Sequence, residues 1–187
     1  MKIIIIEGPD NCGKDALISK ICELYSTVTI IHCSKPKYND STLNEMYQDR
    51  LFYNIALDII GRRYNTDAII LNRAWYGEYV YGTIYRNRTK QSVVDMVSNI
   101  EKSFNTIYDS VYYIQLMTSP VLSNKHEDNK SLSHGDVDTI RIELELFNEI
   151  YDKSTLNKKL IYVNDNDSFR NIKDIHREAI DFINNKL

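Results

Sequence analysis

Residues 2–16 constrain the fold of this chain most strongly, because a run of four isoleucines leads directly into a glycine-containing loop. The run at residues 3–6 has the stiff, β-branched side chains that are typical of a strand buried on both faces. The loop at residues 7–14 reads Glu-Gly-Pro-Asp-Asn-Cys-Gly-Lys. Its glycines permit a turn whose backbone N–H groups face inward, and a following helix directs its positive end to the same place. The stretch predicts a strand, a phosphate-binding loop and a helix.

The residue after this loop departs from the usual motif. Gly-x4-Gly-Lys is normally followed by Ser or Thr, whose hydroxyl binds Mg²⁺, but here Asp15 occupies that position. Because Mg²⁺ readily binds carboxylate oxygen, Asp15 is a predicted metal ligand. The opposing interpretation is that Asp15 repels a bound phosphate, by roughly 4 kcal/mol at about 4 Å and an effective dielectric near 20.

The composition favours one globular domain. A length of 187 residues accommodates a single domain with a sizeable core, so we expect residues 1–187 to form one domain. The longest apolar run is too short to span a bilayer and no leader pattern is present, so we expect no membrane insertion and a cytoplasmic location, in the host cytoplasm if a phage encodes the chain. The net charge of −3 argues against general nucleic-acid binding. Three cysteines without metal-ligand spacing favour free thiols.

Strand and helix patterns alternate along the rest of the chain. Further β-rich runs are predicted at residues 28–33, 67–71, 110–117 and 160–163. Amphipathic helices are predicted at residues 14–25, 41–63, 91–104, 137–151 and 169–183. This alternation predicts an α/β fold, with a parallel sheet covered by helices on both faces.

A polar segment interrupts this alternation at about residues 118–136. Its composition changes to Ser, Asn, Lys, His, Asp and Gly, which is typical of a disordered loop or of a lid that closes over substrate. Lids that assist phosphoryl transfer supply cations, and the candidates here are Lys125 and Lys130.

An arginine and several aromatic residues follow the third predicted strand. Because Arg73 comes directly after a buried strand, its planar fork can face the crevice at the sheet edge and bind a phosphate through two hydrogen bonds. Trp75, Tyr79 and Tyr85 can wall a flat ring or can belong to the core. The phosphate loop upstream favours the binding interpretation.

Together these stretches resemble the thymidylate kinase family of P-loop nucleoside monophosphate kinases, especially its compact phage-type members. The loop at residues 7–14 is similar to the family's Glu-Gly-x-Asp-x-x-Gly-Lys sequence, and Asn72-Arg73 stands where the family has Asp-Arg. Residues 77–82 resemble the stretch that follows, and Leu51-Phe52 resembles a Leu-Phe pair whose phenylalanine stacks on the base. The resemblance covers nearly the whole chain and implies a three-layer α/β/α P-loop NTPase fold, with a five-stranded parallel sheet of order 2-3-1-4-5.

The resemblance also implies a reaction and a set of site residues. The reaction is transfer of the γ-phosphoryl group of ATP to a deoxynucleoside monophosphate, thymidylate or another pyrimidine nucleotide, with Mg²⁺. The implied catalytic residues are Lys14, Arg73, Lys125 and Lys130. The implied ATP-binding residues are Gly8, Asn11, Cys12, Gly13, Lys14, Asp15 and Ala16. The implied acceptor-binding residues are Asp10 and Glu78 near the sugar, Phe52 and Tyr81 at the base, Asn72, and Arg73 at the phosphate. A homodimer formed through helices beside the active site is also implied.

Departures from the family pattern leave alternatives open. Asp15 replaces the metal-binding hydroxyl, Asn72 replaces the strand-end carboxylate, and residues 119–135 contain no arginine. We interpret the first two as an exchange in which the carboxylate has moved to the other side of the metal. One alternative is a catalytically degenerate nucleotide-binding or interaction protein, and another is a deoxynucleoside kinase with Glu7 as its base. The base is also open, because Ala56 stands where thymidylate enzymes tend to have an arginine that reads the pyrimidine.

Overall fold

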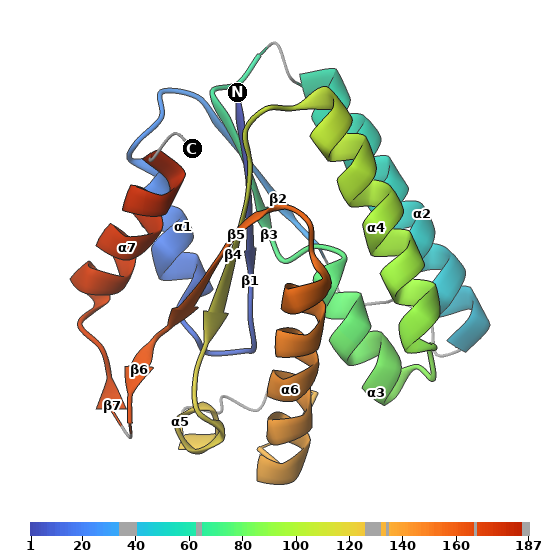
Figure 1. Ribbon diagram of the computed structural model, residues 1–187, viewed down its shortest axis with the longest axis vertical. Coiled ribbons are helices and arrows are strands. Elements are labelled where there is room, and N and C mark those ends of the chain that lie inside the picture. The colour runs from blue at the N-terminus through green and yellow to red at the C-terminus, as the bar shows by residue number, and fades with distance from the viewer. Residues whose placement is uncertain (34–40, 63–64, 126–131, 134, 167, 185–187) are drawn as a thin grey trace.

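A five-stranded parallel sheet forms the centre of the computed structural model (Figure 1), which describes residues 1–33, 41–62, 65–125, 132–133, 135–166 and 168–184. The strands are β1 (Lys2–Glu7), β2 (Val28–His32), β3 (Ala68–Asn72), β4 (Val111–Met117) and β5 (Asn157–Tyr162). Their order, β2-β3-β1-β4-β5, confirms the predicted order. In the register, Ile6 of β1 pairs with Asn72 of β3, so the phosphate loop leaves the sheet beside the end of β3.

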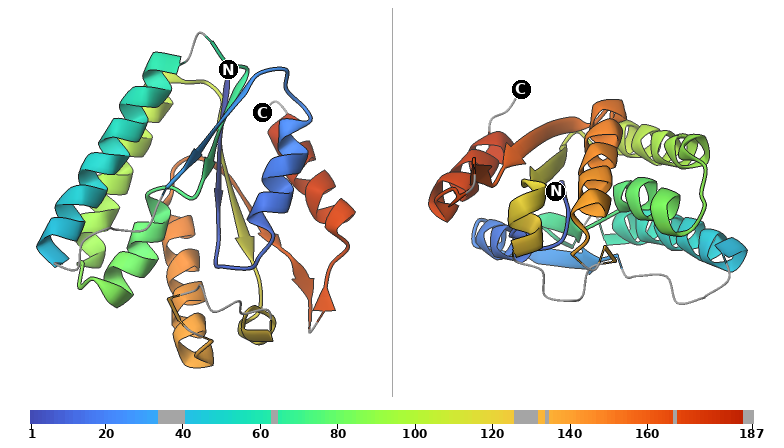
Figure 2. Two further views of the ribbon diagram at one scale, coloured as in Figure 1. Left: turned by 180° about the vertical axis from the view of Figure 1, so that it is seen from behind. Right: turned by 90° about the horizontal axis from the view of Figure 1, so that it is seen from below.

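Helices cover both faces of this sheet, which gives the three layers (Figures 1 and 2). One face carries α1 (Lys14–Cys22) and α7 (Ile172–Asn184). The other carries α2 (Ser41–Arg62), α4 (Lys90–Ile107) and α6 (Val137–Lys153). Side chains alternate along β1, so Ile3 and Ile5 join one core while Ile4 and Ile6 join the other. All four are fully buried, which confirms the prediction of a strand covered on both faces.

Several short elements complete the fold. A π-helix, η1 (Glu78–Gly82), runs into α3 (Thr83–Tyr85), and β6 (Asn164–Asp165) pairs with β7 (Ser168–Phe169) in a hairpin. The helix α5 (Pro120–Lys125) lies within the segment that was predicted as a loop, and β5 begins before the predicted strand. No helix in the described part of the chain is long and apolar enough to cross a membrane.

Gly8 is the tightest point of the strand-to-loop junction. Its φ is 141°, and a Cβ at this position would collide with the main-chain oxygen of Leu116. We therefore expect Gly8→Ala to lower the free energy of unfolding by about 2 kcal/mol or more. Gly61 is the matched control, because it lies in α2 with nothing within 4 Å of an added Cβ. There Gly→Ala is expected to raise stability by up to about 1 kcal/mol. Urea unfolding measures both, and a Gly8→Ala protein as stable as wild type would contradict this packing.

Candidate functional site

The phosphate loop has the strained turn that its glycines predict. Gly8, Asn11 and Gly13 have positive φ values of 141°, 60° and 84°, and Gly13 is the N-cap of α1. Asparagine tolerates this left-handed region better than most side chains. The buried Cys12 thiol donates a hydrogen bond to Pro9 O at 3.0 Å, which closes the loop on itself.

Lys14 is folded into the loop rather than extended into solvent. Its side-chain nitrogen lies 3.0 Å from Gly8 O, 2.5 Å from Pro9 O and 3.6 Å from the Cys12 sulfur, and the residue is only 8% exposed. Burial lowers the pKa of Lys14, although the neighbouring Cys12 acts in the opposite direction. A bound phosphate oxygen would give this ammonium a better partner than the carbonyl oxygens do.

The two residues that depart from the family pattern at the expected metal site, Asp15 and Asn72, lie side by side. Asn72 Nδ2 donates a hydrogen bond to Asp15 Oδ1 at 2.8 Å, joining the end of β3 to the first turn of α1. Both side chains carry hard oxygen atoms of the kind that Mg²⁺ prefers. The described residues contain no group of three or more His, Cys, Asp or Glu side chains that could hold a metal ion by themselves, so phosphate oxygens and water would have to complete the coordination of an ion here.

Arg73 is held at the meeting point of the loop and the end of β3. Its Nη1 donates to Gly8 O at 3.2 Å, its Nη2 forms an ion pair with Asp10, and its guanidinium lies 5.7 Å from the centre of the Tyr81 ring. The structure therefore brings together at the loop three of the residues that the resemblance implies for acceptor binding, Asp10, Arg73 and Tyr81. The side chains of Asp10 and Arg73 are 34% and 24% exposed, so a ligand can reach this pair.

Glu7 lies near Arg73 and was considered from the sequence only as a possible base. It is fully buried, and its Oε1 accepts hydrogen bonds from Ala74 N at 2.6 Å and Gly77 N at 3.3 Å. Burial raises the pKa of Glu7, against the opposing effects of Arg73 and the Ala74 N–H group. Its contacts are those of a residue that shapes the turn after β3.

Glu78 differs most from its predicted environment at the sugar. Its carboxylate lies in a buried cluster, with Arg86 Nη2 at 2.5 Å and Arg88 Nη1 at 3.4 Å. Arg88 also reaches Asp49 of α2 at 3.0 Å. The cluster fastens η1 to α2, and sequence reasoning missed both arginines. The sequence signal for this cluster was weak. Arg86 and Arg88 follow an apolar segment, so they are expected to pair with acidic residues if they are buried, but their spacing does not identify the acidic partner.

The remaining predicted residues are more dispersed. Phe52 is 2% exposed and packs edge-on against Trp75, with the ring centres 6.5 Å apart, so its ring belongs to the core and presents no free face to a base. Lys125 is the exposed last residue of α5, a helix that follows β4 at the end of the sheet where the loop also lies (Figure 1). Lys130 lies outside the described residues. Ala16, in the first turn of α1, is partly buried.

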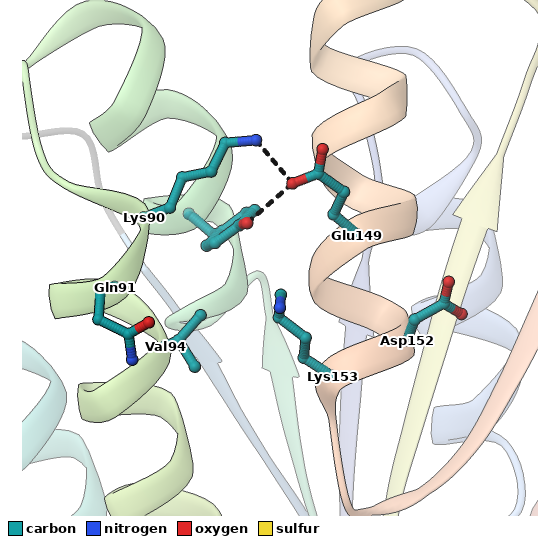
Figure 3. Close-up of a pocket in the computed structure, with 7 residues that line it drawn as sticks. Lys90, Gln91, Val94, Glu149, Asp152 and Lys153 are labelled. Carbon is teal, nitrogen blue, oxygen red and sulfur yellow. Dashed lines mark hydrogen bonds and ion pairs between the residues drawn. The ribbon is translucent and has the colours of Figure 1, made fainter.

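A separate pocket of about 460 Å³ opens between α4 and α6 (Figure 3). Glu149 accepts hydrogen bonds there from Lys90 Nζ at 2.7 Å and from the Tyr79 hydroxyl at 2.8 Å. Burial, and next the bond to Glu149, raise the pKa of Tyr79 to about 12. Tyr79, which the sequence offered as a wall for a flat ring, lines this pocket, whereas none of the residues implied to bind ATP or the acceptor does. We therefore assign the contacts of Glu149 with Tyr79 and Lys90 a structural role: they tie η1 and α4 to α6, while Tyr81 of η1 lies against Arg73.

A β1–loop–α1 unit with a buried lysine, in a 2-3-1-4-5 parallel sheet covered on both faces, matches the P-loop NTPase α/β fold. Solved structures agree. A thymidylate kinase from Candida albicans has a TM-score of 0.69 at 15% identity, covering 97% of this chain and 90% of that one. The YorR protein of Bacillus subtilis, solved with phosphorylated GDP, has a TM-score of 0.65 at 20% identity, covering 96% and 94%. Polyphosphate kinase 2 from Arthrobacter aurescens has a TM-score of 0.63 at 11% identity, covering 97% and 65%.

Comparison of the sequence with known families and proteins gives no match. No protein-family model matches the chain, and a search of curated proteins finds no match. Because the structural neighbours are at most 20% identical to this chain, their similarity establishes the fold alone, which this chain shares with thymidylate kinases.

Proposed function

We propose that this chain transfers the γ-phosphoryl group of ATP to a nucleoside monophosphate, with a deoxynucleoside monophosphate of the thymidylate type as the preferred acceptor. One observation carries the proposal: Lys14 from the loop and Arg73 from the end of β3 both contact Gly8 O, at 3.0 and 3.2 Å. Two cations from different elements thus converge on one atom. In-line phosphoryl transfer requires two phosphates held close together, one by each cation.

The roles of the residues follow from this convergence. Lys14 and the loop amides would hold the donor phosphates, and Arg73 the acceptor phosphate. Asp10, now paired with Arg73, would be released to a sugar hydroxyl when a phosphate takes the arginine. Mg²⁺, held by Asp15 and Asn72 together with phosphate oxygens, would neutralise charge on the transferred group.

Glu7 bears on the deoxynucleoside kinase alternative. That activity requires a carboxylate base that can reach a 5′-hydroxyl. Because Glu7 is fully buried and bonded to two backbone N–H groups, its environment argues against such a role.

A screen of acceptors tests the proposed reaction. ATP is incubated with each deoxynucleoside and each deoxynucleoside monophosphate, with and without Mg²⁺, and ADP release is measured. The similar structures include a thymidylate kinase and a protein solved with phosphorylated GDP, so purines and pyrimidines both belong in the screen. We expect Mg²⁺-dependent turnover of a monophosphate. Nucleotide binding without turnover would favour the degenerate alternative, and turnover of nucleosides the deoxynucleoside kinase.

The carboxylate exchange makes a separate prediction at Asp15. We expect Asp15→Ala to lower Mg²⁺-dependent turnover at least about tenfold, because one metal ligand is lost, whereas Asp15→Ser should retain turnover by supplying a hydroxyl. The double variant Asp15→Ser with Asn72→Asp restores the family pattern and should be active. The measurement is turnover and nucleotide binding as a function of Mg²⁺ concentration. Full activity in Asp15→Ala would exclude Asp15 as a ligand, and higher activity would show that it repels phosphate.

We also propose a homodimer formed through α2. Met46, Tyr53 and Leu57 are 65%, 50% and 66% exposed, and separations of seven and eleven residues put them on one stripe of the helix. An exposed apolar stripe of this kind suits a second copy of the same helix. We expect sedimentation to show a dimer for wild type and a monomer for Leu57→Arg. A monomeric wild type would contradict the proposal.

A further inference from the structure

Arg73 has a strained backbone that its neighbours hold in place. Its φ is 63°, in the left-handed region that side chains with a Cβ seldom adopt. Such strain persists only where surrounding contacts fix it, and it concentrates at functional positions. Two of these contacts come from β1 and the loop that follows it: Ile6 O accepts from Arg73 N at 3.0 Å, and Gly8 O accepts from Arg73 Nη1 at 3.2 Å.

The residue between Ile6 and Gly8 supplies the third contact through its side chain. Glu7 Oε1 accepts from Ala74 N at 2.6 Å and from Gly77 N at 3.3 Å, so it fixes both ends of the turn that follows Arg73. Three consecutive residues therefore fix the position of Arg73. Ile6 binds its backbone N–H group, Glu7 binds the turn that follows it, and Gly8 binds its guanidinium. A change in this turn would move the guanidinium relative to the phosphate loop.

The second oxygen of Glu7 distinguishes positioning from proton transfer. Among the residues that the structure describes, Oε2 of Glu7 is buried and has no hydrogen-bond partner. A general base must reach the proton that it removes, which a fully buried carboxyl beneath the turn does not. The raised pKa caused by burial also favours the neutral acid, whose Oε1 still accepts both N–H groups.

We propose that Glu7 is the positioning residue of the acceptor site: its Oε1 caps the 74–77 turn and thereby aims the strained Arg73 at the acceptor phosphate. The inference rests on the proposed function for the identity of the ligand, and on the observed contacts for the geometry. The role requires an acceptor atom at Oε1 and requires no charge.

Two substitutions separate this role from that of a base. Glu7→Gln keeps the oxygen and the shape, so the KM for thymidine 5′-monophosphate and kcat should stay within about twofold of wild type. Glu7→Ala removes the cap, and the KM for the acceptor should rise on the order of 10- to 100-fold, with the KM for ATP little changed. A large loss of kcat in Glu7→Gln with an unchanged acceptor KM would overturn the proposal and identify Glu7 as a base. If Glu7→Ala does not fold, the kinetics of Glu7→Gln alone distinguish the two roles.

A control and a second readout keep the test independent of activity. Glu178 is a partly buried carboxylate of α7, on the face of the sheet opposite to α2, α4 and α6, where it pairs with Lys159 at 3.2 Å and Arg170 at 3.1 Å. Glu178→Ala should leave the acceptor KM unchanged. The side-chain Nε–H resonance of Arg73 in ¹⁵N-labelled protein should shift in Glu7→Ala and stay in place in Glu7→Gln. If no acceptor turns over, the proposed function fails, while an unshifted Arg73 resonance in Glu7→Ala would overturn the positioning role itself.

Discussion

Replacing Lys14 with methionine is expected to lower kcat/KM for phosphoryl transfer by about a thousandfold, with the fold intact. Lys14 is the only lysine in the loop at residues 7–14, and an uncharged side chain of similar length cannot stabilise the phosphate oxygens in the transition state. Folding should not suffer, because the substitution removes a buried ammonium whose pKa is already lowered by desolvation. The free energy of unfolding should therefore be unchanged or higher.

Lys20 provides the matched control for this experiment. It lies in the same helix, α1, and its ammonium pairs at the surface with Glu23 at 2.5 Å. Lys20→Met should retain near wild-type kcat/KM, because exposed pairs of this kind contribute at most about 1 kcal/mol to stability and this one is not part of the loop. Steady-state kinetics and urea unfolding on both variants make the comparison. Activity of Lys14→Met within tenfold of wild type would show that the loop does not hold the donor.

Glu101→Ala is expected to cause the largest loss of stability, about 3–5 kcal/mol. Glu101 in α4 is 1% exposed and accepts four hydrogen bonds, from the Tyr76 hydroxyl at 2.7 Å, Ser154 Oγ at 2.6 Å, and Thr155 N and Oγ1 at 2.7 Å each. The network joins α4 to the segment between β3 and η1, which contains Tyr76. It also joins α4 to the turn between α6 and β5. Alanine would leave the buried hydroxyls of Tyr76 and Ser154 without this acceptor in the interior and would open a cavity.

Asp95 is a suitable control for this loss. It also lies in α4, but at the surface, where it accepts one hydrogen bond from Gln91 at 2.8 Å. Asp95→Ala is expected to change the free energy of unfolding by no more than about 0.5 kcal/mol. Urea unfolding followed by circular dichroism compares the two variants. A loss below 1 kcal/mol in Glu101→Ala would contradict the observed network.

Local patterns predicted the fold because each strand of the sheet has a distinct signature. The isoleucines of β1 are buried on both faces, and the alternating helices required the three layers that the structure has. The helix α5 was missed because six residues are too few for periodicity, although Ser119 before Pro120 is a recognisable start: Ser119 Oγ accepts from Leu122 N at 3.2 Å. The early residues of β5 were missed because its lysines are unusual in a strand, although β5 lies at an edge of the sheet.

The sequence predicted the positions of site residues that directly follow the ends of strands. It did not predict the surroundings of residues whose environment depends on partners far away in the sequence. Arg73 meets Asp10 because parallel strands end at one edge, which the sequence shows. The core position of Phe52 depends on Trp75, and helical spacing does not distinguish a buried aromatic from a binding platform. The environment of Glu78 depends on arginines that reach it through tertiary folding.

Transfer of label from [γ-³²P]ATP tests the central claim most directly. The protein is incubated with Mg²⁺, labelled ATP and thymidine 5′-monophosphate or another deoxynucleoside monophosphate, and the products are separated. We predict that the label appears in the deoxynucleoside diphosphate, and that it does not when Lys14 is replaced by methionine. Label that stays in ATP, or that appears only as inorganic phosphate with every monophosphate, would contradict the assignment of Lys14 and Arg73 to a donor and an acceptor phosphate.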